Sequence, residues 1–380
     1  GVYADSKGMI WVGAEGLNMF NPNTERVKTW SEITKIISIT EDYGNRIWVT
    51  TERGIYRLNQ KNGQIKHFPM DSEVPGSDYV HDIHVDKTGK ILAATWGGGL
   101  WVFKPSVNRF QPVIDINKHE KLAHLKYLYE DRKGKLWAGN DAGIFQLDKE
   151  YNPVFSLTNN TERELQLNGS YTYCMYQDIE GNYWIGTNRG LQCYNPDKKK
   201  ISSFGRKNGF RNEVILGILE DRENNFWLTT YSGLVKLSRL DSSVRVFTSR
   251  DGLISNQFSQ GSVAISPVDQ TFYLGSIEGL VYFDPLQLES NTIAPAVIFT
   301  DFRVFNKSIN PVDNNSLLEK HITHTNTIAL PYKYSVFSFK YIGIHYGASE
   351  AVEYEYKLEG FDGNWRSVGT TRSATYTNLK

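Results

Sequence analysis

The chain has 380 residues, in which 42 Lys and Arg are balanced by 42 Asp and Glu. This zero net charge argues against a nucleic-acid-binding domain, and no run of about 18 apolar residues is present that could cross a membrane. Aromatic residues make up 13% of the sequence, glycine occurs 32 times, and no long stretch has the period of a helix. The composition therefore predicts an all-β protein with many turns.

One short pattern recurs throughout residues 1–285. Each of the first six copies has an Asp, a turn residue, a large residue six positions after the Asp, a small residue and then a Gly-Leu or Gly-Ile pair. The seventh copy is degenerate at its front, because Tyr273 replaces the Trp and the turn before it is two residues shorter. Seven copies give a period of roughly 44 residues, within the range of four-stranded propeller blades. We therefore predict a seven-bladed β-propeller. The large residues are Trp11, Trp48, Leu92, Trp137, Trp184, Trp227 and Tyr273.

The repeated residues are expected to be structural, because they recur with the blade whereas a binding or catalytic site uses unique residues. The large residue and the small one after it should pack between blades. A left-handed turn residue is expected at Gly8, Gly44, Gly89, Gly134, Gly181 and Asn224, since Gly and Asn tolerate that conformation best. The main structural positions are Asp42, Gly44, Trp48, Asp131, Gly134, Trp137, Asp178, Gly181, Trp184, Asp221 and Trp227.

The strand order within a blade decides which loops share a face. In the fifth copy we predict strands at residues 171–176, 183–187, 191–194 and 201–204. Because the strands alternate in direction, the Thr-x-x-Gly-Leu turns and the connections between blades lie on one face, here called the long-loop face. The Asp-x-x-Gly and Asn-Pro turns, including the basic turn 198–200, lie on the opposite face, the Asp-turn face. The long connections are residues 69–80, 156–170, 205–212 and 250–260.

The long-loop face is the expected binding face, since long and individual loops carry most binding sites. Trp96 and Tyr231 occupy turn positions where the other copies have polar residues or Ile. An exposed aromatic ring can stack on a sugar ring, and Arg can add hydrogen bonds, above all to an acidic sugar. For Trp96 the alternative is packing against a neighbouring loop. The candidate ligand contacts are Trp96, Arg189, Arg206, Arg211 and Tyr231.

The sequence predicts no metal site and no cofactor. His81/His84 and His321/His324 are spaced three apart, and on strands such pairs point to opposite faces. Cys174 and Cys193 fall on the first and third strands of one blade, about 9–10 Å apart, beyond the roughly 7 Å that a disulfide spans. We expect two free, buried thiols. A carboxylate pair for glycoside hydrolysis, assembled from distant loops, stays an alternative.

The repeats stop near residue 285. Residues 286–294 are predicted to be a linker, and residues 295–380 an incomplete β-sandwich of the immunoglobulin or fibronectin III type that ends before its last strands. Strands are expected at residues 297–305, 327–330, 336–341, 352–358 and 374–376. This C-terminal unit should be less stable than the propeller.

Two motifs carry a family resemblance. The repeat Glu-Asp-x-x-Gly-x-x-Trp-x-Gly-Thr-x-x-Gly-Leu resembles the two-component regulator propeller repeat. The run Tyr354-Glu-Tyr356-Lys-Leu-Glu-Gly360-Phe-Asp-Gly-Asn-Trp365, followed by Ala374-Thr-Tyr376-Thr-Asn-Leu379, resembles the triple-tyrosine (YYY) domain that follows such propellers. The resemblance implies the periplasmic sensor region of a hybrid two-component histidine kinase that detects an oligosaccharide and controls polysaccharide use.

The same resemblance implies two partners, a second propeller of the same protein and a second copy in a homodimeric receptor. It places the kinase outside these residues, so no enzyme activity is expected here, and neither nucleic-acid nor membrane contact. Two alternatives stay open. One is a propeller lyase or hydrolase acting on polysaccharide, and the other is a structural array that binds no ligand and serves dimerisation.

Overall fold

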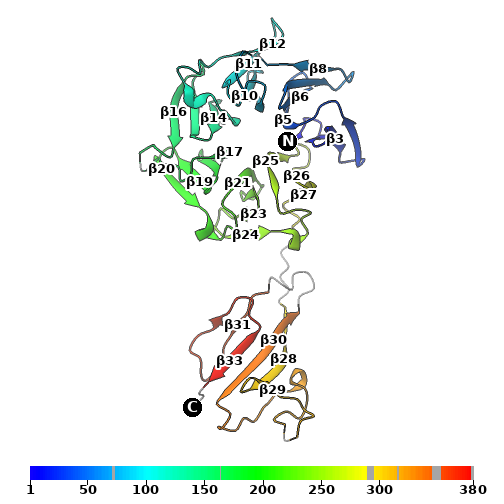
Figure 1. Cartoon of the computed structure of the whole chain (residues 1–380), viewed down its shortest axis with the longest axis vertical. Helices are drawn as coiled ribbons and strands as arrows, with labels where there is room; N and C mark the ends of the chain where they lie inside the picture. The colour runs from blue at the N-terminus through cyan, green and yellow to red at the C-terminus, as the bar shows by residue number, and fades with distance from the viewer. Residues whose placement is uncertain (71–72, 163, 289–294, 315, 345–351, 378–380) are drawn as a thin grey trace. The chain divides into compact units, whose positions relative to one another are not determined.

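The computed structural model describes residues 1–70, 73–162, 164–288, 295–314, 316–344 and 352–377. The chain divides into two compact units, Gly1–Leu288 and Glu289–Lys380. Regular structure in the described ranges is β-strand apart from four short 3-10 segments, so the all-β prediction is confirmed (Figure 1). Within those ranges no helix is long and apolar enough to span a membrane.

The first unit consists of seven antiparallel sheets, each with its strands in chain order. The first three sheets are β1 (Val2–Ala4), β2 (Ile10–Gly13), β3 (Leu17–Asn21), β4 (Arg26–Trp30); β5 (Ile36–Glu41), β6 (Arg46–Thr51), β7 (Gly54–Asn59), β8 (Ile65–Phe68); and β9 (Val80–Val85), β10 (Ile91–Thr95), β11 (Leu100–Lys104), β12 (Arg109–Pro112).

The next three sheets also have four strands. They are β13 (Tyr127–Glu130), β14 (Leu136–Asn140), β15 (Gly143–Leu147), β16 (Pro153–Thr158); β17 (Thr172–Gln177), β18 (Tyr183–Thr187), β19 (Gly190–Asn195), β20 (Lys200–Phe204); and β21 (Ile215–Glu220), β22 (Phe226–Thr230), β23 (Gly233–Leu237), β24 (Val244–Phe247). The seventh sheet has three strands in the described part of the chain, β25 (Phe258–Ile265), β26 (Phe272–Ser276) and β27 (Gly279–Phe283).

The first strands of the sheets form a closed inner ring. Each of β1, β5, β9, β13, β17, β21 and β25 contacts the first strand of the next sheet, and β25 contacts β1. Figure 1 shows the sheets arranged around this ring. Seven sheets in a closed ring fit the predicted seven-bladed propeller.

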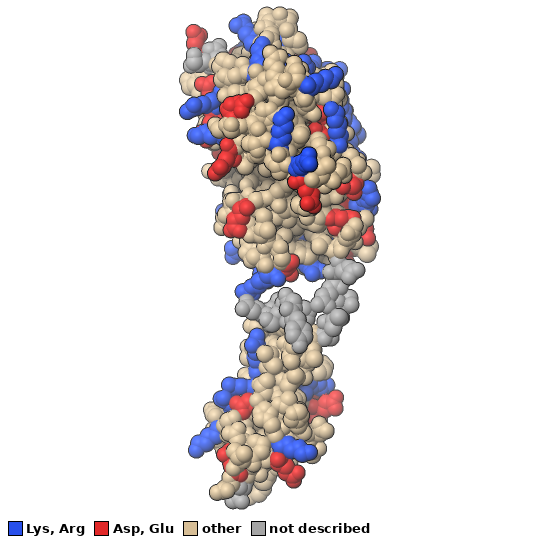
Figure 2. All heavy atoms as spheres, turned by 90° about the vertical axis from the view of Figure 1, so that its right-hand side faces the viewer, with Lys and Arg blue, Asp and Glu red and all other residues tan. Residues whose placement is uncertain are grey.

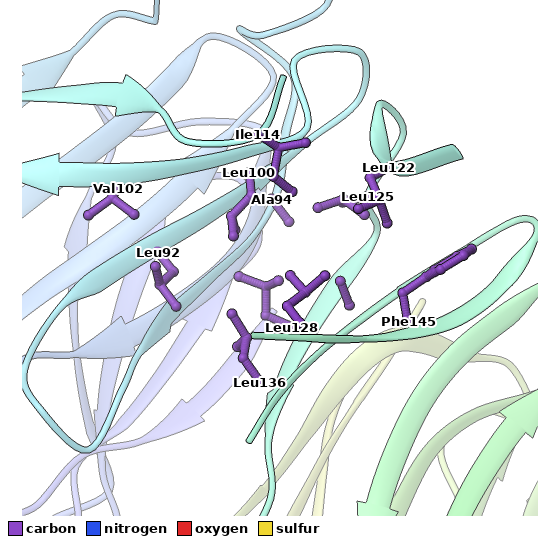
Figure 3. Close-up of a cluster of buried hydrophobic side chains, with 12 residues drawn as sticks. Leu92, Ala94, Leu100, Val102, Ile114, Leu122, Leu125, Leu128, Leu136 and Phe145 are labelled. Carbon is purple, nitrogen blue, oxygen red and sulfur yellow. The ribbon is translucent and has the colours of Figure 1, made fainter. Parts of the chain in front are cut away.

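The large repeated residue packs between neighbouring blades, as predicted. Trp48 of β6 contacts Phe103 of the next sheet, with ring centroids 5.1 Å apart. Trp184 of β18 lies 4.6 Å from Phe226 of the next sheet. Where Leu92 replaces the Trp, the interface becomes aliphatic. Figure 3 shows this cluster between the third and fourth sheets, with Leu92, Ala94, Leu100 and Val102 facing Leu128 and Leu136.

A hydrogen bond explains the fixed spacing between Asp and Trp. In each of the five copies that have both, the indole Nε1 donates to the Asp Oδ2 at 2.6–3.2 Å. The other carboxylate oxygen of Asp5 accepts the backbone N–H groups two and four residues later, both at 2.9 Å. The Asp therefore holds its own turn and the buried Trp of the following strand at the same time.

The predicted turn conformation holds in five of the six copies. Gly8, Gly89, Gly134 and Gly181 have φ between 77° and 87°, and Asn224 has 61°. The prediction for Gly44 is wrong, because the left-handed residue in that copy is Asn45, with φ of 56°. Asn45 is the residue three positions after the Asp, and its N–H closes the turn by donating to the Asp42 carbonyl at 2.8 Å.

These turns make propeller stability sensitive to acid. Burial works against ionisation of Asp131, but hydrogen bonds from the Lys135 N–H, the Tyr183 hydroxyl and the Trp137 indole outweigh it and hold the pKa of the carboxyl below its usual value. A lowered folded-state pKa gives stability that is complete above the unfolded pKa of about 4 and is lost as the pH falls through the folded pKa.

We therefore expect the difference in free energy of unfolding between wild type and Asp131→Asn to shrink on acidification. Urea unfolding at about pH 6 and about pH 3 measures this difference. A difference that stays constant over this range would show that the Asp131 charge contributes nothing to the turn.

The second unit is built on one four-stranded sheet in the order β29-β28-β30-β33 and a separate β31-β32 pair. The predicted strands at 297–305, 336–341 and 374–376 are confirmed, while 352–358 shortens to a two-residue strand. The strands are β28 (Ala296–Val304), β29 (Lys307–Ser308), β30 (Val336–Ile344), β31 (Glu355–Tyr356), β32 (Arg366–Ser367) and β33 (Ser373–Thr377).

The strand predicted at 327–330 is wrong. That stretch is irregular, and its Ile328 and Leu330 pack against the core of the unit. The alternation of apolar residues there therefore reflects burial of these two side chains and not pairing with another β-strand. Residues 289–294 of the predicted linker and Leu379 of the second motif lie outside the described residues.

The tyrosines of the C-terminal motifs support the core of the second unit. Tyr354 and Tyr376 are each 5% exposed. The Tyr354 hydroxyl accepts the Gly343 N–H at 2.9 Å, and the Tyr376 hydroxyl donates to Asp362 at 2.9 Å. Burial and the bond to Asp362 raise the pKa of Tyr376 to about 12. These buried and hydrogen-bonded tyrosines therefore stabilise the sheet and the segments packed on it.

Cys174 on β17 and Cys193 on β19 are free thiols, as predicted from their strand positions. Both residues are partly exposed overall, so the expectation of complete burial is only partly met. Burial of the sulfur raises the pKa of each thiol to about 12. Neither is a reactive cysteine at neutral pH.

Candidate ligand-binding face

Backbone hydrogen bonds join the hairpin turns to the connections between blades on the long-loop face. The N–H of Trp96 donates to the Tyr79 carbonyl at 3.0 Å, and that of Asn188 to the Tyr171 carbonyl at 3.1 Å. Between neighbouring blades, the Gly233 N–H donates to Asn256 at 2.7 Å. These bonds place hairpin turns of the third, fifth and sixth sheets beside connections between blades, as strand alternation predicts.

Trp96 is half-exposed and sits in a group of rings. It lies between β10 and β11, with its ring centroid 5.4 Å from His81 and 5.0 Å from His124. Its relative exposure of 38% leaves part of the ring free to contact a ligand. One part of the Trp96 ring therefore packs on neighbouring loops and another part faces solvent, while contact with a ligand stays a prediction.

Lys126 lies at the centre of this group. Its Nζ is 5.1 Å from the ring centroid of Tyr171 and 5.7 Å from those of Trp96 and Tyr173. It also forms an ion pair with Asp141. The Lys126 side chain is only 13% exposed. Aromatic faces and a carboxylate together hold this partly desolvated ammonium in place. We call Trp96, Lys126, Asp141, Tyr171 and Tyr173 the Lys126 cluster.

Tyr231, the second predicted aromatic contact, borders the same cluster. Burial raises the pKa of Tyr173, and the neighbouring Tyr231, Asp141 and Tyr171 raise it further. Tyr171 and Tyr231 are 43% and 48% exposed. The structure thus places Trp96 of the third sheet within the Lys126 cluster and Tyr231 of the sixth sheet near its Tyr173.

His81 also borders the cluster and is neutral at physiological pH. Burial lowers the pKa of His81 to about 4; the nearby Lys126 lowers it further and Asp141 opposes them. A neutral imidazole can donate one hydrogen bond and accept another.

Replacing Lys126 with Met should raise the pKa of His81 above about 4, because the ammonium is removed while Asp141 remains. An NMR titration of the His81 ring measures this pKa, with Lys199→Met on the Asp-turn face as the control. An unchanged His81 pKa in Lys126→Met would contradict the electrostatic contact.

Below the cluster, a cavity of about 230 Å³ is lined by residues of the first strands, including Ser38, Asp82 and Tyr173. Asp82 accepts hydrogen bonds from the Ser38 hydroxyl at 2.7 Å and the Leu128 N–H at 2.8 Å. Burial nevertheless raises the pKa of this carboxyl. This cavity shares Lys126 and Tyr173 with the cluster, and its lining combines polar and apolar side chains.

The three predicted arginines are not members of the Lys126 cluster. Arg189 lines a polar pocket of about 400 Å³ with Asn168, Ser170 and Asn188. The buried Oδ1 of Asn188 has no hydrogen-bond partner among the described atoms. Arg206 is 76% exposed and pairs with Glu213 at 3.7 Å, and Arg211 is exposed in the same connection. They form a second, polar part of the long-loop face.

Sequence reasoning missed Lys126, His124, Tyr171 and Tyr173. His124 and Lys126 end the connection that follows β12, which was not among the predicted long connections. A usable signal is the Tyr171-x-Tyr173 pair at the start of a first strand, because residues two apart share one side of a strand. Comparison of the repeats does not reveal these residues, because each occurs in one blade and has no equivalent in the other copies.

The His pairs form no metal site. On β9, His81 faces the ring group while His84 lies 3.4 Å from Glu130. His321 caps the 3-10 segment η4 (Ile322–His324), whose last residue is His324, so the prediction that this pair lies on a strand was wrong. The Nδ1 atom of His321 lies 2.6 Å from the Thr323 hydroxyl. Across the described ranges no group of three or more His, Cys, Asp or Glu could hold a metal ion.

The Asp-turn face has short, similar turns. Lys199 has φ of 49°, and the Lys198 N–H donates to the Asn195 side chain at 2.7 Å, so Lys198 and Lys199 lie in an exposed local turn that leads into β20. Figure 2 shows basic and acidic side chains interspersed over one side of the chain. This mixture fits the neutral net charge.

Two family models match the chain. The two component regulator propeller model matches residues 166–189, and the Y_Y_Y domain model matches residues 345–380. The first match includes the whole of β17 and β18 and most of the residues that line the polar pocket beside Arg189.

Several known proteins are similar over most of the chain. Histidine kinase P4 of Formosa agariphila is 26% identical over 399 residues, covering 98% of this chain and 28% of that protein. The extracellular domain of a putative one component system from B. thetaiotaomicron is 23% identical with a TM-score of 0.59, covering 100% of this chain and 51% of that one. Virginiamycin B lyase from Staphylococcus aureus is 13% identical with a TM-score of 0.59, covering 74% and 92%.

The two structural likenesses show the fold alone at these identities. This chain spans 28% of the curated kinase and 51% of the extracellular domain that it matches. Residues 166–189 are thus similar to a two component regulator propeller repeat, and residues 345–380 are similar to a Y_Y_Y domain.

Proposed function

We propose that this chain is the extracytoplasmic sensor region of a hybrid two-component histidine kinase, and that its long-loop face binds an oligosaccharide. The similarity to a histidine kinase over 98% of the chain supports the sensor role. The observation that supports the ligand class is the Lys126 cluster, where exposed aromatic rings border a fixed ammonium and carboxylate. Rings that stack on sugar faces beside polar groups that bond hydroxyls are typical of sugar sites.

The charge of the site favours a sugar with a carboxylate. Lys126 and, in the polar pocket, Arg189 provide cations on the long-loop face. Asp141 already pairs with Lys126, so a neutral sugar could use the same ion pair through its hydroxyl groups. We propose an acidic oligosaccharide, a periplasmic location, and a receptor that includes a second propeller and a second copy of the chain.

The experiment is a calorimetric titration of the chain with neutral and uronic-acid oligosaccharides, combined with a reducing-end assay on the same sugars. We expect binding of an acidic member and no turnover. Turnover of any sugar would replace the sensor with a propeller enzyme. Binding of neutral sugars alone would be consistent with the sensor role but would contradict the proposal that the ligand is acidic.

A further inference from the structure

The interface between the third and fourth sheets lacks the aromatic residues of the interface before it. Between the second and third sheets, Trp48, Phe68 and Phe103 pack together, with ring centroids 5.1–5.5 Å apart. The corresponding residues one blade later have the same spacing from the repeated Asp or from the turn glycine. All three are aliphatic, namely Leu92, Val113 and Leu147.

A recess of about 630 Å³ lies at this aliphatic interface, and we call it the Leu92 recess. Leu92, Leu136 and Leu147 line its floor and are 1%, 9% and 3% exposed. Figure 3 shows Leu92 and Leu136 in the buried cluster between the two sheets. The volume falls within the range of about 300–1,000 Å³ that is typical of small-molecule sites.

Tyr151 adds an aromatic ring to the lining of the recess. It lies in the turn between β15 and β16, has φ of 67° and packs against the same buried cluster. A positive φ is uncommon for a bulky residue. The repeat does not require a Tyr here, because the left-handed residue of this turn in the other five four-stranded sheets is polar or glycine. Those residues are Glu25, Gly63, Asn108, Lys199 and Ser242.

Asp86, which also lines the recess, has an unused acceptor. Its Oδ1 accepts the N–H groups of Thr88 at 2.8 Å and Lys90 at 2.9 Å, as the turn of the repeat demands. In the five copies with a Trp, the other carboxylate oxygen accepts the indole N–H. Leu92 supplies no such donor, and within the described ranges no other group donates to Oδ2 of Asp86. This oxygen can therefore accept a hydrogen bond from an occupant of the recess.

The charged residues around the recess favour an anion. The carboxylate of Glu130 accepts the Lys87 N–H at 2.9 Å, and that of Asp148 accepts two backbone N–H groups of its own turn. The four lysines of the lining, in contrast, form no ion pair with any residue that the structure describes. Their ammonium groups are available to a bound carboxylate. These lysines are Lys90, Lys133, Lys135 and Lys149.

We propose that the Leu92 recess binds a small indole-type carboxylate. Its flat ring lies over Leu92 and Leu136 beside Tyr151, its ring N–H donates to Asp86, and its carboxylate lies among the four lysines. The bound ring repeats the contact between indole and Asp that the other blades make with their own Trp. The Leu92 recess shares no residue with the Lys126 cluster, so this site is independent of the proposed oligosaccharide site.

The test is a calorimetric titration of the 380-residue chain with three probes that share one ring system. We expect indole-3-acetate to bind. Tryptamine has the same ring and the opposite charge, and 1-methylindole-3-acetate lacks the N–H group, so each should bind roughly tenfold more weakly. Equal affinity for tryptamine would contradict the role of the lysines. Equal affinity for 1-methylindole-3-acetate would contradict the hydrogen bond to Asp86.

Two sets of variants locate the bound probe. Leu92→Trp supplies the missing ring, so it should raise the melting temperature and abolish binding of indole-3-acetate. Lys133→Met and Lys149→Met change only exposed side chains and should each weaken binding about two- to fivefold, the effect of one surface charge. They also test the site if Leu92→Trp does not fold. Lys199→Met, in the corresponding turn of the fifth sheet, is the control and should bind like wild type.

Three further outcomes would overturn the proposal. The first is that indole-3-acetate does not bind the wild-type chain. The second is that a folded Leu92→Trp variant and both lysine variants bind it unchanged, which would place the probe elsewhere. The third is that an acidic peptide with one Trp binds the recess while free indole-3-acetate does not, which would make a protein partner the occupant.

Discussion

Replacing Trp184 with Ala is expected to lower the free energy of unfolding of the propeller by roughly 3–5 kcal/mol. Trp184 is 7% exposed, and its ring lies 4.6 Å from Phe226 of the next blade and 5.6 Å from Phe204. Alanine would leave a cavity between two blades and remove the indole that donates to the buried Asp178 at 2.8 Å. Both losses act on the same interface.

Urea unfolding followed by tryptophan fluorescence measures this effect. Eight of the nine tryptophans lie in Gly1–Leu288, so the signal reports mainly on the propeller. Tyr43→Ala is the matched control, because this aromatic residue is 74% exposed in the turn after Asp42 and should change stability by no more than about 0.5 kcal/mol. If both variants unfolded at the same urea concentration, Trp184 would not be a core residue between blades.

Replacing Trp96 or Tyr231 with Ala should weaken oligosaccharide binding by roughly 10- to 100-fold, the loss expected when a half-buried aromatic contact is removed. The two residues border the same Lys126 cluster, so the effects of the double variant should not be additive. Both side chains are about half exposed, so the fold and the unfolding free energy should change little.

The matched control is Lys199→Ala, in an exposed turn on the Asp-turn face. It should bind like wild type. Weaker binding in this variant, with normal binding in the Trp96 and Tyr231 variants, would move recognition to the opposite face.

The repeats made most of the propeller predictable. A Trp that recurs beside a small residue and a turn glycine specifies a blade interface wherever it occurs, so Trp48, Trp137 and Trp227 could be assigned without a structure. The hydrogen bond from the indole to the Asp was not predicted, although the constant six-residue interval between Asp and Trp is the sequence feature that this bond produces. The Gly44 assignment failed because the left-handed residue lies three positions after the Asp, and in this copy that position is Asn45.

The candidate site was predictable only in part. Trp96 and Tyr231 stood out because they break a repeated turn pattern. Lys126 and Tyr173 come from single connections and first strands, and their convergence depends on how third, fourth, fifth and sixth blades meet around the ring. In the second unit, residues 327–330 have the alternation of a strand but serve as irregular packing against the core, a distinction that depends on neighbours distant in sequence.

A crystal structure of the chain with a bound uronic-acid oligosaccharide tests the central claim most directly. We predict sugar rings stacked on Trp96 or Tyr231, with a carboxylate or hydroxyl near the ion pair of Lys126 and Asp141. A sugar bound instead among the turns around Lys199 on the Asp-turn face would contradict this account.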